Sequence, residues 1–390
     1  MPRFVARTLA LTLLLASAAA GAHDPSAYGG LFRSRNLGGT WLNADVELFL
    51  SAALTVAVDP RDPAHLLMGT DLGLMRSRSG GRSWAPEAPG LIFGAVFAVA
   101  FSPDGRGAIC AAPGGVFRFL DGEWVGARAP DGAAPARGVA LGAALDRVYL
   151  LGNDELFASE DGGRSYSRVA DTLAEGSEIT ALAVATRPKE VLFAVVDGAL
   201  MASEDGGGRW LRRTAGLGDG PVDTVALDPS SPSRIWAAGA DRVYVSDDLG
   251  GTWRTVGQPL PEAGTTVRGI AADPAATTLV VTTHRGMYRS EDGGRSWALQ
   301  EGNLPVHLEA GPLVRDPSDA QTLYAVYSLV PYPEVWRTAV EGGTLLARVD
   351  PVSLAGGLAF LLLLIIGGAL LARWLAGRRP ARPIPGRSLP

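Results

Sequence analysis

The sequence predicts an all-β fold: a seven-bladed β-propeller with four-stranded antiparallel blades, plus one C-terminal transmembrane helix. Two observations predict it. A short phrase that closes on an aromatic residue recurs every 40 to 44 residues, and an uncharged apolar stretch, Val352 to Ala372, lies near the C-terminus. A period of about 40–45 residues is the length of one propeller blade. The repeat therefore predicts the fold, and it says much less about chemistry.

The repeated phrase has Ser at its first position, an acid at the third, Gly at the fifth and an aromatic residue at the eighth. The acid can accept backbone N–H groups of its own turn, and Gly permits positive φ. These are the demands of a tight turn between the third and fourth strands of a blade, so we expect a structural role rather than a catalytic one. The residues concerned are Ser159, Asp161, Gly163, Ser203, Asp205, Gly207, Trp210, Ser246, Asp248, Gly250, Trp253, Ser290, Asp292, Gly294 and Trp297. Two earlier copies replace the acid, with Asn36 and Ser79.

Counting first strands gives seven blades; they begin near Leu54, Val96, Arg137, Ile179, Val222, Val267 and Gly311. Counting hairpins gives eight, because Tyr28 to Leu42 carries a full phrase with no first strands before it. Open strand edges invite aggregation, so a ring must close. We expect the N-terminal segment to join the last blade and supply an outer strand. The end of the last unit, Val335 to Leu346, is expected to form a hairpin of its own.

The chain ends predict export and a membrane anchor. Residues 1–22 have two arginines, an apolar run and a small-residue end, as in a signal peptide. Residues 23–350 form the propeller. A transmembrane helix is expected at 351–375, because 21 uncharged residues make about 31 Å of helix. The Arg/Pro-rich residues 376–390 fit a cytoplasmic tail. The expected location is a single-pass membrane protein with its propeller outside the cytoplasm, in the periplasm or the extracellular space.

Charge and cysteine content exclude several classes of protein. Between residues 23 and 350 there are 28 basic and 40 acidic residues, a balance of −12. That balance argues against nucleic acid as a partner. Cys110 is the single cysteine, so no intrachain disulfide can form. The four His residues and Cys110 have no zinc-binding spacing, and no metal or cofactor is expected.

The phrase S-x-D-x-G-x-[ST]-W resembles that of the Asp-box, or BNR-repeat, propellers, over about residues 28–345. This superfamily includes sialidases, sortilin-type receptor domains and xyloglucan-degrading hydrolases, and the chain is also similar to the photosystem II assembly factor family. The resemblance implies the propeller fold. For function it leaves two classes open: a binding or assembly scaffold, and a glycoside hydrolase.

A glycoside hydrolase of these families would need particular motifs and catalytic residues, and the sequence matches them poorly. The resemblance to sialidases would imply a Phe-Arg-Ile-Pro motif, three arginines and a Tyr–Glu nucleophile. Here Phe32-Arg33 continues as Ser34-Arg35, inside a repeat. Tyr324, Tyr327 and Tyr332 with Glu334 are the residues that could imitate the nucleophile pair. Xyloglucan hydrolases use two propellers around a cleft, and this chain has room for one. We therefore expect no catalytic residue.

The expected ligand face gathers the turns between second and third strands and those between blades around the central channel. These turns carry Asp71, Asp154, Asp197, Asp241, Arg242, His284 and Arg285. Together they predict a mostly acidic recognition rim for a protein or an envelope glycan. Ordinary polar turn residues are the alternative interpretation. The sequence thus favours a non-catalytic binding or assembly-scaffold propeller, anchored in the membrane.

Overall fold

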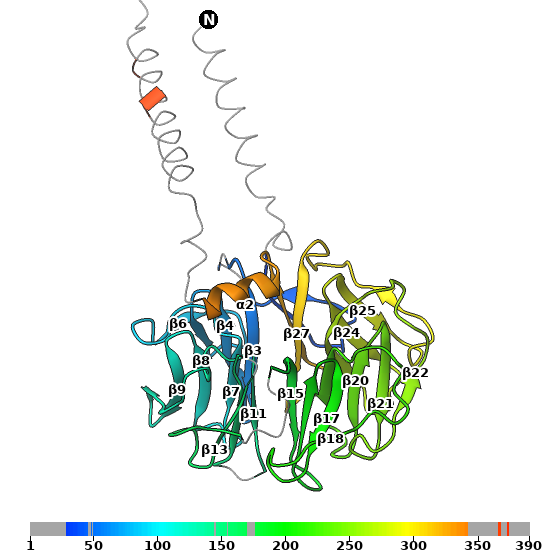
Figure 1. Ribbon diagram of the computed structural model, residues 1–390. Coiled ribbons are helices and arrows are strands. Elements are labelled where there is room, and N and C mark those ends of the chain that lie inside the picture. Colours follow the sequence, from blue (N-terminus) through cyan, green and yellow to red (C-terminus); the bar gives the residue numbers. More distant parts are fainter. Residues whose placement is uncertain are drawn as a thin grey trace, which may run out of the picture. The chain divides into compact units, whose positions relative to one another are not determined.

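The computed structural model contains seven four-stranded antiparallel sheets arranged as the blades of a propeller (Figure 1). The structure describes residues 29–45, 48, 50–143, 146–153, 155–169 and 176–341, together with the isolated positions 366, 367 and 373. Within these residues the prediction of seven blades is confirmed, and the eight-bladed alternative is wrong. Each of the first six blades is a simple meander of four strands that follow one another in sequence.

The first three blades occupy the chain up to Arg168. Blade 1 comprises β3 (Ala53–Asp59), β4 (Asp62–Thr70), β5 (Leu74–Ser77) and β6 (Ala85–Glu87). Blade 2 comprises β7 (Ala98–Phe101), β8 (Ala108–Ala112), β9 (Gly115–Leu120) and β10 (Glu123–Gly126). Blade 3 comprises β11 (Gly138–Leu141), β12 (Val148–Leu151), β13 (Leu156–Ser159) and β14 (Ser167–Arg168).

The next three blades repeat the same order. Blade 4 comprises β15 (Ile179–Ala185), β16 (Val191–Val196), β17 (Ala199–Ser203) and β18 (Leu211–Arg212). Blade 5 comprises β19 (Thr224–Leu227), β20 (Ile235–Gly239), β21 (Arg242–Ser246) and β22 (Arg254–Val256). Blade 6 comprises β23 (Val267–Ala272), β24 (Leu279–Thr283), β25 (Gly286–Ser290) and β26 (Ala298–Leu299).

Blade 7 joins the two ends of the propeller. Its first two strands, β27 (Glu309–Arg315) and β28 (Leu323–Ser328), come from the C-terminal side. Its third and fourth, β1 (Gly30–Ser34) and β2 (Leu42–Asn43), come from the N-terminal side. β1 pairs antiparallel with β28, with Phe32 opposite Ala325. The N-terminal segment therefore closes the ring as expected, but it supplies two outer strands rather than one.

The second strand is buried along its whole length in blades 2 to 7, because each sheet packs between two neighbouring blades. β16, with the sequence VLFAVV, is buried at all six positions, and β20 is buried at all five. Side chains from adjacent blades then share one core: Phe193 of blade 4 packs with Ile235 and Trp253 of blade 5. Burial of these inter-blade faces provides the main favourable free energy of folding.

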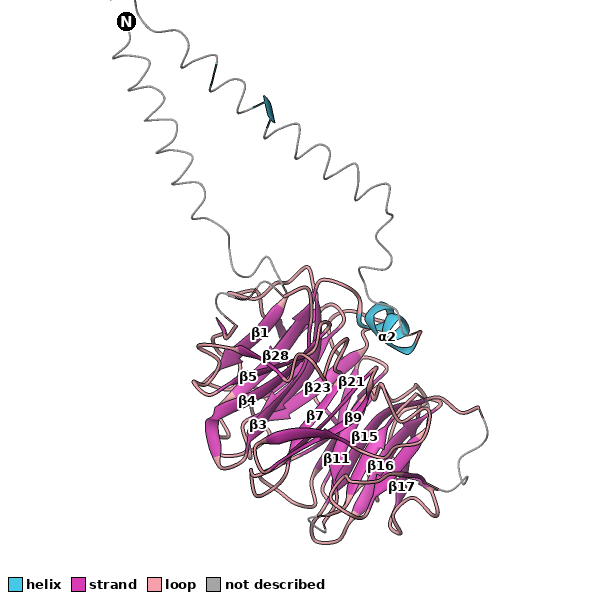
Figure 2. Cartoon of the chain, turned by 90° about the vertical axis from the view of Figure 1, so that its left-hand side faces the viewer, coloured by secondary structure: helices cyan, strands magenta, loops and turns pink. Residues whose placement is uncertain are grey.

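The expected hairpin at Val335 to Leu346 is wrong. Residues Tyr332–Val340 form a helix, α2, which lies at one end of the blades (Figures 1 and 2). Pro333 stands in its first turn, where a missing N–H costs nothing. Val335 and Ala339 are four residues apart and both are buried, so the helix presents an apolar face to the propeller.

The chain divides into two compact units, Met1–Gly342 and Gly343–Pro390. The described blades and α2 all lie in the first unit. Among the residues that the structure describes, no helix has the length and apolar character needed to cross a membrane. The expected signal peptide (1–22) lies outside the described residues, and so do the transmembrane helix (351–375) and the tail (376–390), apart from the isolated positions 366, 367 and 373.

Candidate functional site

The helix α2 lies across the beginnings of several inner strands, which define the mouth of the central channel. Its Tyr332 hydroxyl donates a hydrogen bond to the Ala53 carbonyl oxygen of β3 at 2.9 Å. The Tyr332 backbone N–H donates to Glu309 Oε2 of β27 at 3.2 Å. Val335 and Ala339 pack in one cluster with Leu54 of β3. α2 is therefore fixed to blades 7 and 1 at the end of the channel where the inner strands begin.

A cavity of about 430 Å³ opens beside α2 at this mouth. Its lining comes from all seven inner strands, or from the residues just before them, and from the helix. The lining residues are Leu54, Phe97, Arg137, Glu178, Thr180, Ala181, Asp223, Thr224, Thr266, Val267, Arg268, Pro312, Tyr332, Pro333 and Trp336. We call it the channel-mouth cavity. Its volume lies within the range of small-molecule binding pockets.

Two arginines stack on the aromatic side chains of α2 in this cavity. The guanidinium carbon of Arg137 lies 4.6 Å from the ring centroid of Trp336, and that of Arg268 lies 4.8 Å from the ring centroid of Tyr332. Phe97 meets Trp336 edge to face, with 5.2 Å between ring centroids. Because each cation lies over an aromatic face, the stacks attract electrostatically and hold α2 over the channel.

The cations of the cavity are balanced by carboxylates. Arg268 Nη1 lies 2.9 Å from Glu309 Oε2, and Arg137 Nη1 lies 3.7 Å from Glu178 Oε1. A further carboxylate, that of Asp223, accepts a hydrogen bond from the Val267 N–H at 3.0 Å. Burial raises the pKa of Asp223. The channel-mouth cavity therefore combines aromatic surface with charges that largely cancel one another.

Three of the predicted rim residues, Asp197, Asp241 and His284, bind the backbone of segments that lead into inner strands. Asp197 accepts the Glu178 N–H at 2.9 Å, and the His284 Nδ1 accepts the Thr266 N–H at 3.0 Å. Glu178 and Thr266 are themselves lining residues of the channel-mouth cavity. Asp197 and His284 thus position residues of the cavity without being part of its lining.

The other predicted rim residues are held in similar ways. Asp71 accepts the Ser51 hydroxyl at 2.5 Å, and burial raises the pKa of Asp71. Asp241 accepts the N–H groups of Gly264 and Thr265 at 3.0 and 2.5 Å.

Two of the predicted cations are exposed, and one residue cannot be placed. Arg285 forms an ion pair with Glu262 at 2.8 Å, and Arg242 is exposed at the beginning of β21. Asp154 lies outside the described residues. Arg285 Nε donates to His284 Nε2 at 3.1 Å, and none of the described rim residues lines the channel-mouth cavity.

The repeated phrases form four near-identical turns between the third and fourth strands of their blades. In the turn of blade 5, Ser246 Oγ donates to Asp248 Oδ1 at 2.7 Å and accepts the Gly250 N–H at 2.8 Å. Asp248 Oδ1 accepts the Thr252 N–H at 2.8 Å. Gly250 has a φ of +77°, which favours glycine. Corresponding bonds recur at Ser159–Asp161–Gly163, Ser203–Asp205–Gly207 and Ser290–Asp292–Gly294.

The aromatic residues that close these turns also connect neighbouring blades. Trp253 Nε1 donates to the Arg213 carbonyl oxygen at 2.8 Å, so the turn of blade 5 is bonded to blade 4. The Asp292 carboxylate accepts the Ser296 hydroxyl at 2.6 Å. Hydrogen bonds from Ser296 and Ser290 lower the pKa of Asp292 to about 2. These acids therefore stay ionised as acceptors for their own turns, and their geometry is structural.

Neither a metal centre nor a reactive thiol is found in the part of the chain that the structure describes. No group of three or more His, Cys, Asp or Glu side chains there could hold a metal ion. Cys110 is fully buried in β8, and burial raises the pKa of its thiol. Tyr332, one of the tyrosines considered for a nucleophile pair, donates its hydroxyl to the Ala53 carbonyl oxygen.

Comparison with known proteins establishes the fold and leaves the family open. No protein-family model matches the chain, and no curated protein does. Similar solved structures include YCF48 bound to a D1 peptide, with 18% identity and a TM-score of 0.55, covering 74% of this chain and 95% of that chain. YCF48 from Cyanidioschyzon merolae has 16% identity and a TM-score of 0.54, covering 72% and 97%.

A glycoside hydrolase is also among the similar structures. The GH74 xyloglucanase from Xanthomonas campestris has 20% identity and a TM-score of 0.53, covering 71% of this chain and 53% of that chain. This chain thus spans about half of the hydrolase. At these identities the likeness supports one statement, that this protein has the β-propeller fold of these neighbours.

Proposed function

We propose that this protein is a non-catalytic binding or assembly-scaffold propeller of the Asp-box type, and that its channel-mouth cavity holds a segment of a partner protein. One observation carries the proposal. Two arginine–aromatic stacks, Arg137 with Trp336 and Arg268 with Tyr332, meet in one cavity at the end of the channel. The four side chains come from three places in the sequence that only the folded ring brings together.

The composition of this cavity suits a protein ligand. Trp, Tyr and Arg are the residue types that carry most of the binding energy at protein interfaces. Trp336 and Tyr332 are half-buried and both line the cavity, so a ligand in the cavity would contact them. Arg268 and Arg137 are already near Glu309 and Glu178, which reduces the cost of desolvating them. A segment with an apolar or aromatic anchor therefore fits better than a highly charged one.

The comparisons are consistent with this function. One of the similar propellers was solved with a bound D1 peptide, so a propeller of this size can hold a peptide. The four turns with Ser, Asp and Gly in identical roles support the Asp-box assignment. An envelope glycan remains the alternative ligand within the same proposal.

The proposed location is the cell envelope. Signal-like residues 1–22, an apolar stretch at 351–375 and an arginine-rich end at 376–390 support export with a membrane anchor. Protease protection of the tail in intact cells or spheroplasts, with digestion of the propeller, would support this orientation. Protection of the propeller with digestion of the tail would contradict it.

The test of the binding function is comparative capture. The full-length chain is solubilised from the membrane, and wild type is compared with Trp336→Ala by quantitative mass spectrometry of co-purified proteins. Phe93→Ala is the matched control, because Phe93 is 57% exposed, lies in the loop between β6 and β7 and is not part of the cavity lining. We expect Trp336→Ala to lose the partner and Phe93→Ala to retain it. Equal capture by both variants would contradict the proposal.

Glycoside hydrolysis is a second candidate function, favoured by one observation. Glu178 and Asp223, two carboxylates, line the same cavity, and burial raises the pKa of Asp223. A glycosidase uses one protonated and one ionised carboxylate. Release of reducing sugar from oligosaccharides that Asp223→Asn abolishes would establish hydrolysis. The hydrogen bond from Val267 to Asp223 and the ion pair of Glu178 give both carboxylates a structural use, which favours the binding function.

A further inference from the structure

A second cavity lies at the junction of blades 7 and 1, on the face opposite α2. It has a volume of about 450 Å³ and is formed by turns that join first to second and third to fourth strands. We call it the junction pocket. Its lining residues are Arg33, Arg35, Pro63, Ala64, Ser79, Gly80, Arg82, Asp316, Ser318, Asp319, Thr322 and Tyr324. It shares no residue with the channel-mouth cavity.

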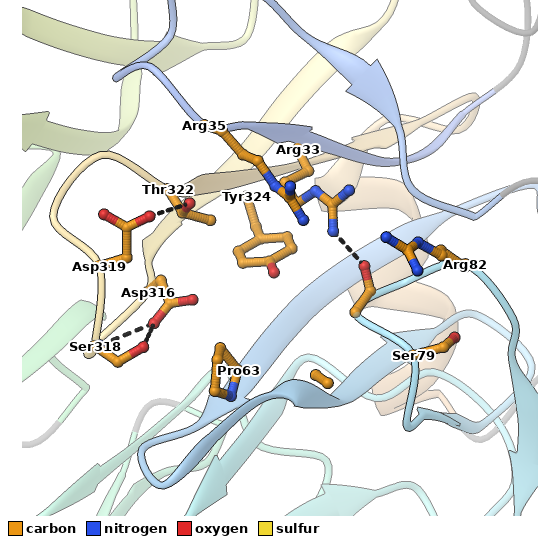
Figure 3. A pocket seen from close by; sticks show the side chains of 12 residues that line it. Arg33, Arg35, Pro63, Ser79, Arg82, Asp316, Ser318, Asp319, Thr322 and Tyr324 are labelled. Carbon is orange, nitrogen blue, oxygen red and sulfur yellow. Dashed lines mark hydrogen bonds between the residues drawn. The ribbon is translucent and has the colours of Figure 1, made fainter.

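Three arginines form one side of the junction pocket. Figure 3 shows Arg33, Arg35 and Arg82 on one side, Asp316 and Asp319 on the other, and Tyr324 between them. Arg33 Nη1 donates to the Gly80 carbonyl oxygen at 2.5 Å. The guanidinium groups of Arg35 and Arg82 are exposed, and neither forms an ion pair or hydrogen bond with a residue of the described ranges. Arg35 and Arg82 are thus available to a ligand, and Arg33 adds a third positive charge beside them.

The repeated phrase explains why the arginine side of the junction pocket is positively charged. The two phrases that lack the acid at their third position are the two that border the junction pocket, with Asn36 in blade 7 and Ser79 in blade 1. Ser79 Oγ accepts the Ser83 N–H at 2.9 Å, as Asp292 accepts that of Ser296. Asn36 Oδ1 likewise accepts the Thr40 N–H at 2.8 Å. Both turns therefore keep their hydrogen bonds and lose a negative charge.

The opposite side of the pocket offers acceptors. Asp316 Oδ1 accepts the Ser318 hydroxyl at 2.7 Å, and Asp319 Oδ2 accepts the Thr322 hydroxyl at 2.7 Å. Each carboxylate has further lone pairs for a ligand hydroxyl. A ligand that is anionic throughout would be repelled here. The pocket therefore fits a molecule with a compact anionic end and a hydroxylated remainder.

We propose that the junction pocket binds a sugar phosphate as its monoester, with the phosphate against Arg33, Arg35 and Arg82 and the sugar hydroxyls against Asp316 and Asp319. A phosphate monoester carries nearly two negative charges near neutral pH, which suits three guanidinium groups better than a single carboxylate does. The volume accommodates one such molecule. This site is independent of the proposed function of the channel-mouth cavity.

The test is isothermal titration calorimetry of the full-length chain in detergent, with glucose 6-phosphate, inorganic phosphate, glucose and glucuronate as separate probes. We expect glucose 6-phosphate to bind with a Kd below about 1 mM, and the other three to bind at least about tenfold more weakly. The combined substitution Arg35→Gln and Arg82→Gln should weaken binding of glucose 6-phosphate at least about tenfold. Arg295→Gln is the control, since Arg295 occupies the position of Arg82 in the phrase of blade 6, which keeps its acid.

A substitution that restores the missing negative charge of the blade 1 phrase completes the test. Ser79→Asp returns the acid to its usual position and should leave the melting temperature of the protein unchanged or higher, while weakening binding of glucose 6-phosphate about tenfold. Three results would overturn the proposal: no binding of glucose 6-phosphate, equal binding of inorganic phosphate or glucuronate, or binding that survives both Ser79→Asp and the double arginine substitution. Loss of binding in Arg295→Gln would also count against it.

Discussion

The guanidinium of Arg137 lies over the indole ring of Trp336, with 4.6 Å between the guanidinium carbon and the ring centroid. Arg137 immediately precedes β11 of blade 3, and Trp336 belongs to α2, which follows blade 7 in sequence. This contact joins the helix to blade 3, whereas the bond from Tyr332 to Ala53 joins it to blade 1. α2 is thus fixed at two separate points of the channel mouth.

This stack predicts an energetic coupling between Arg137 and Trp336. A cation–π contact at a partly buried site contributes about 0.5–2 kcal/mol. In a double-mutant cycle with Arg137→Ala and Trp336→Ala, urea unfolding of the full-length chain should give a coupling free energy in that range. Strictly additive effects of the two substitutions would show that the stack does not hold the helix.

Closure of the ring predicts a large effect at Phe32. This side chain is 1% exposed in β1 and meets Tyr327 of β28 edge to face, with 5.3 Å between ring centroids. Phe32→Ala should lower the free energy of unfolding by about 3–5 kcal/mol, because it leaves a cavity between the N-terminal and C-terminal strands of blade 7. Leu42→Ala on the neighbouring β2, where Leu42 is 62% exposed, is the control and should change it by less than about 0.5 kcal/mol.

The repeated turns predict a specific role for their first serine. Ser246 is 1% exposed and its hydroxyl accepts the buried Gly250 N–H. Ser246→Ala leaves that N–H without its acceptor and should lower the free energy of unfolding by about 1–3 kcal/mol. Thr252→Ala removes one exposed hydroxyl from the same turn and should have little effect. Thermal or urea unfolding distinguishes the two, and equal effects would refute the structural role of Ser246.

The buried carboxyl group of Asp45 should make the stability of the folded protein depend on pH. It is 2% exposed, accepts the Leu31 N–H at 3.1 Å, and burial raises its pKa to about 6. The folded protein therefore binds this proton more tightly than the unfolded chain, whose pKa is near 3.8. The protonated Asp45 stabilises the folded state, and this contribution to the free energy of unfolding is complete below pH 3.8. It is lost as the pH rises through about 6. Asp45→Asn keeps the acceptor oxygen and should remove this part of the pH dependence, as measured by urea unfolding between pH 4 and 7. If the free energies of unfolding of wild type and Asp45→Asn differ by the same amount at every pH, this prediction is wrong.

The number and order of the blades could be predicted from the sequence, because each blade repeats the same local demands. The phrase at Ser290 to Trp297 needs a turn of one geometry, and the apolar run at Leu279–Thr283 needs burial on both faces. Such requirements are local: a mostly apolar second strand recurs in all seven blades, and the phrase, with or without its acid, recurs in six of them. Closure by the N-terminal strands followed from the incomplete unit at Tyr28 to Leu42.

The channel-mouth cavity could not be predicted in the same way. It depends on α2, where the last repeat unit predicted a hairpin at Val335 to Leu346 instead of a helix. One signal was available: Tyr332, Val335, Trp336 and Ala339 have helical spacing, and Pro333 suits a first helical turn. The contacts of α2 with Phe97, Arg137 and Arg268 join residues more than 60 positions apart, so no local pattern reports them. The predicted rim residues Asp197, Asp241 and His284 accept backbone N–H groups of neighbouring segments, and the ligand role predicted for them stays a prediction.

Site-specific photocrosslinking tests the central claim most directly, since it asks which face of the propeller meets a partner in intact cells. A photoreactive amino acid is placed in the full-length chain at Pro333, which is exposed and lines the channel-mouth cavity, or at Leu299 on the outer strand β26. The account predicts one discrete crosslinked partner from position 333, lost on adding Arg268→Ala, and none from position 299. A partner crosslinked equally from both positions, or from 299 alone, would contradict it.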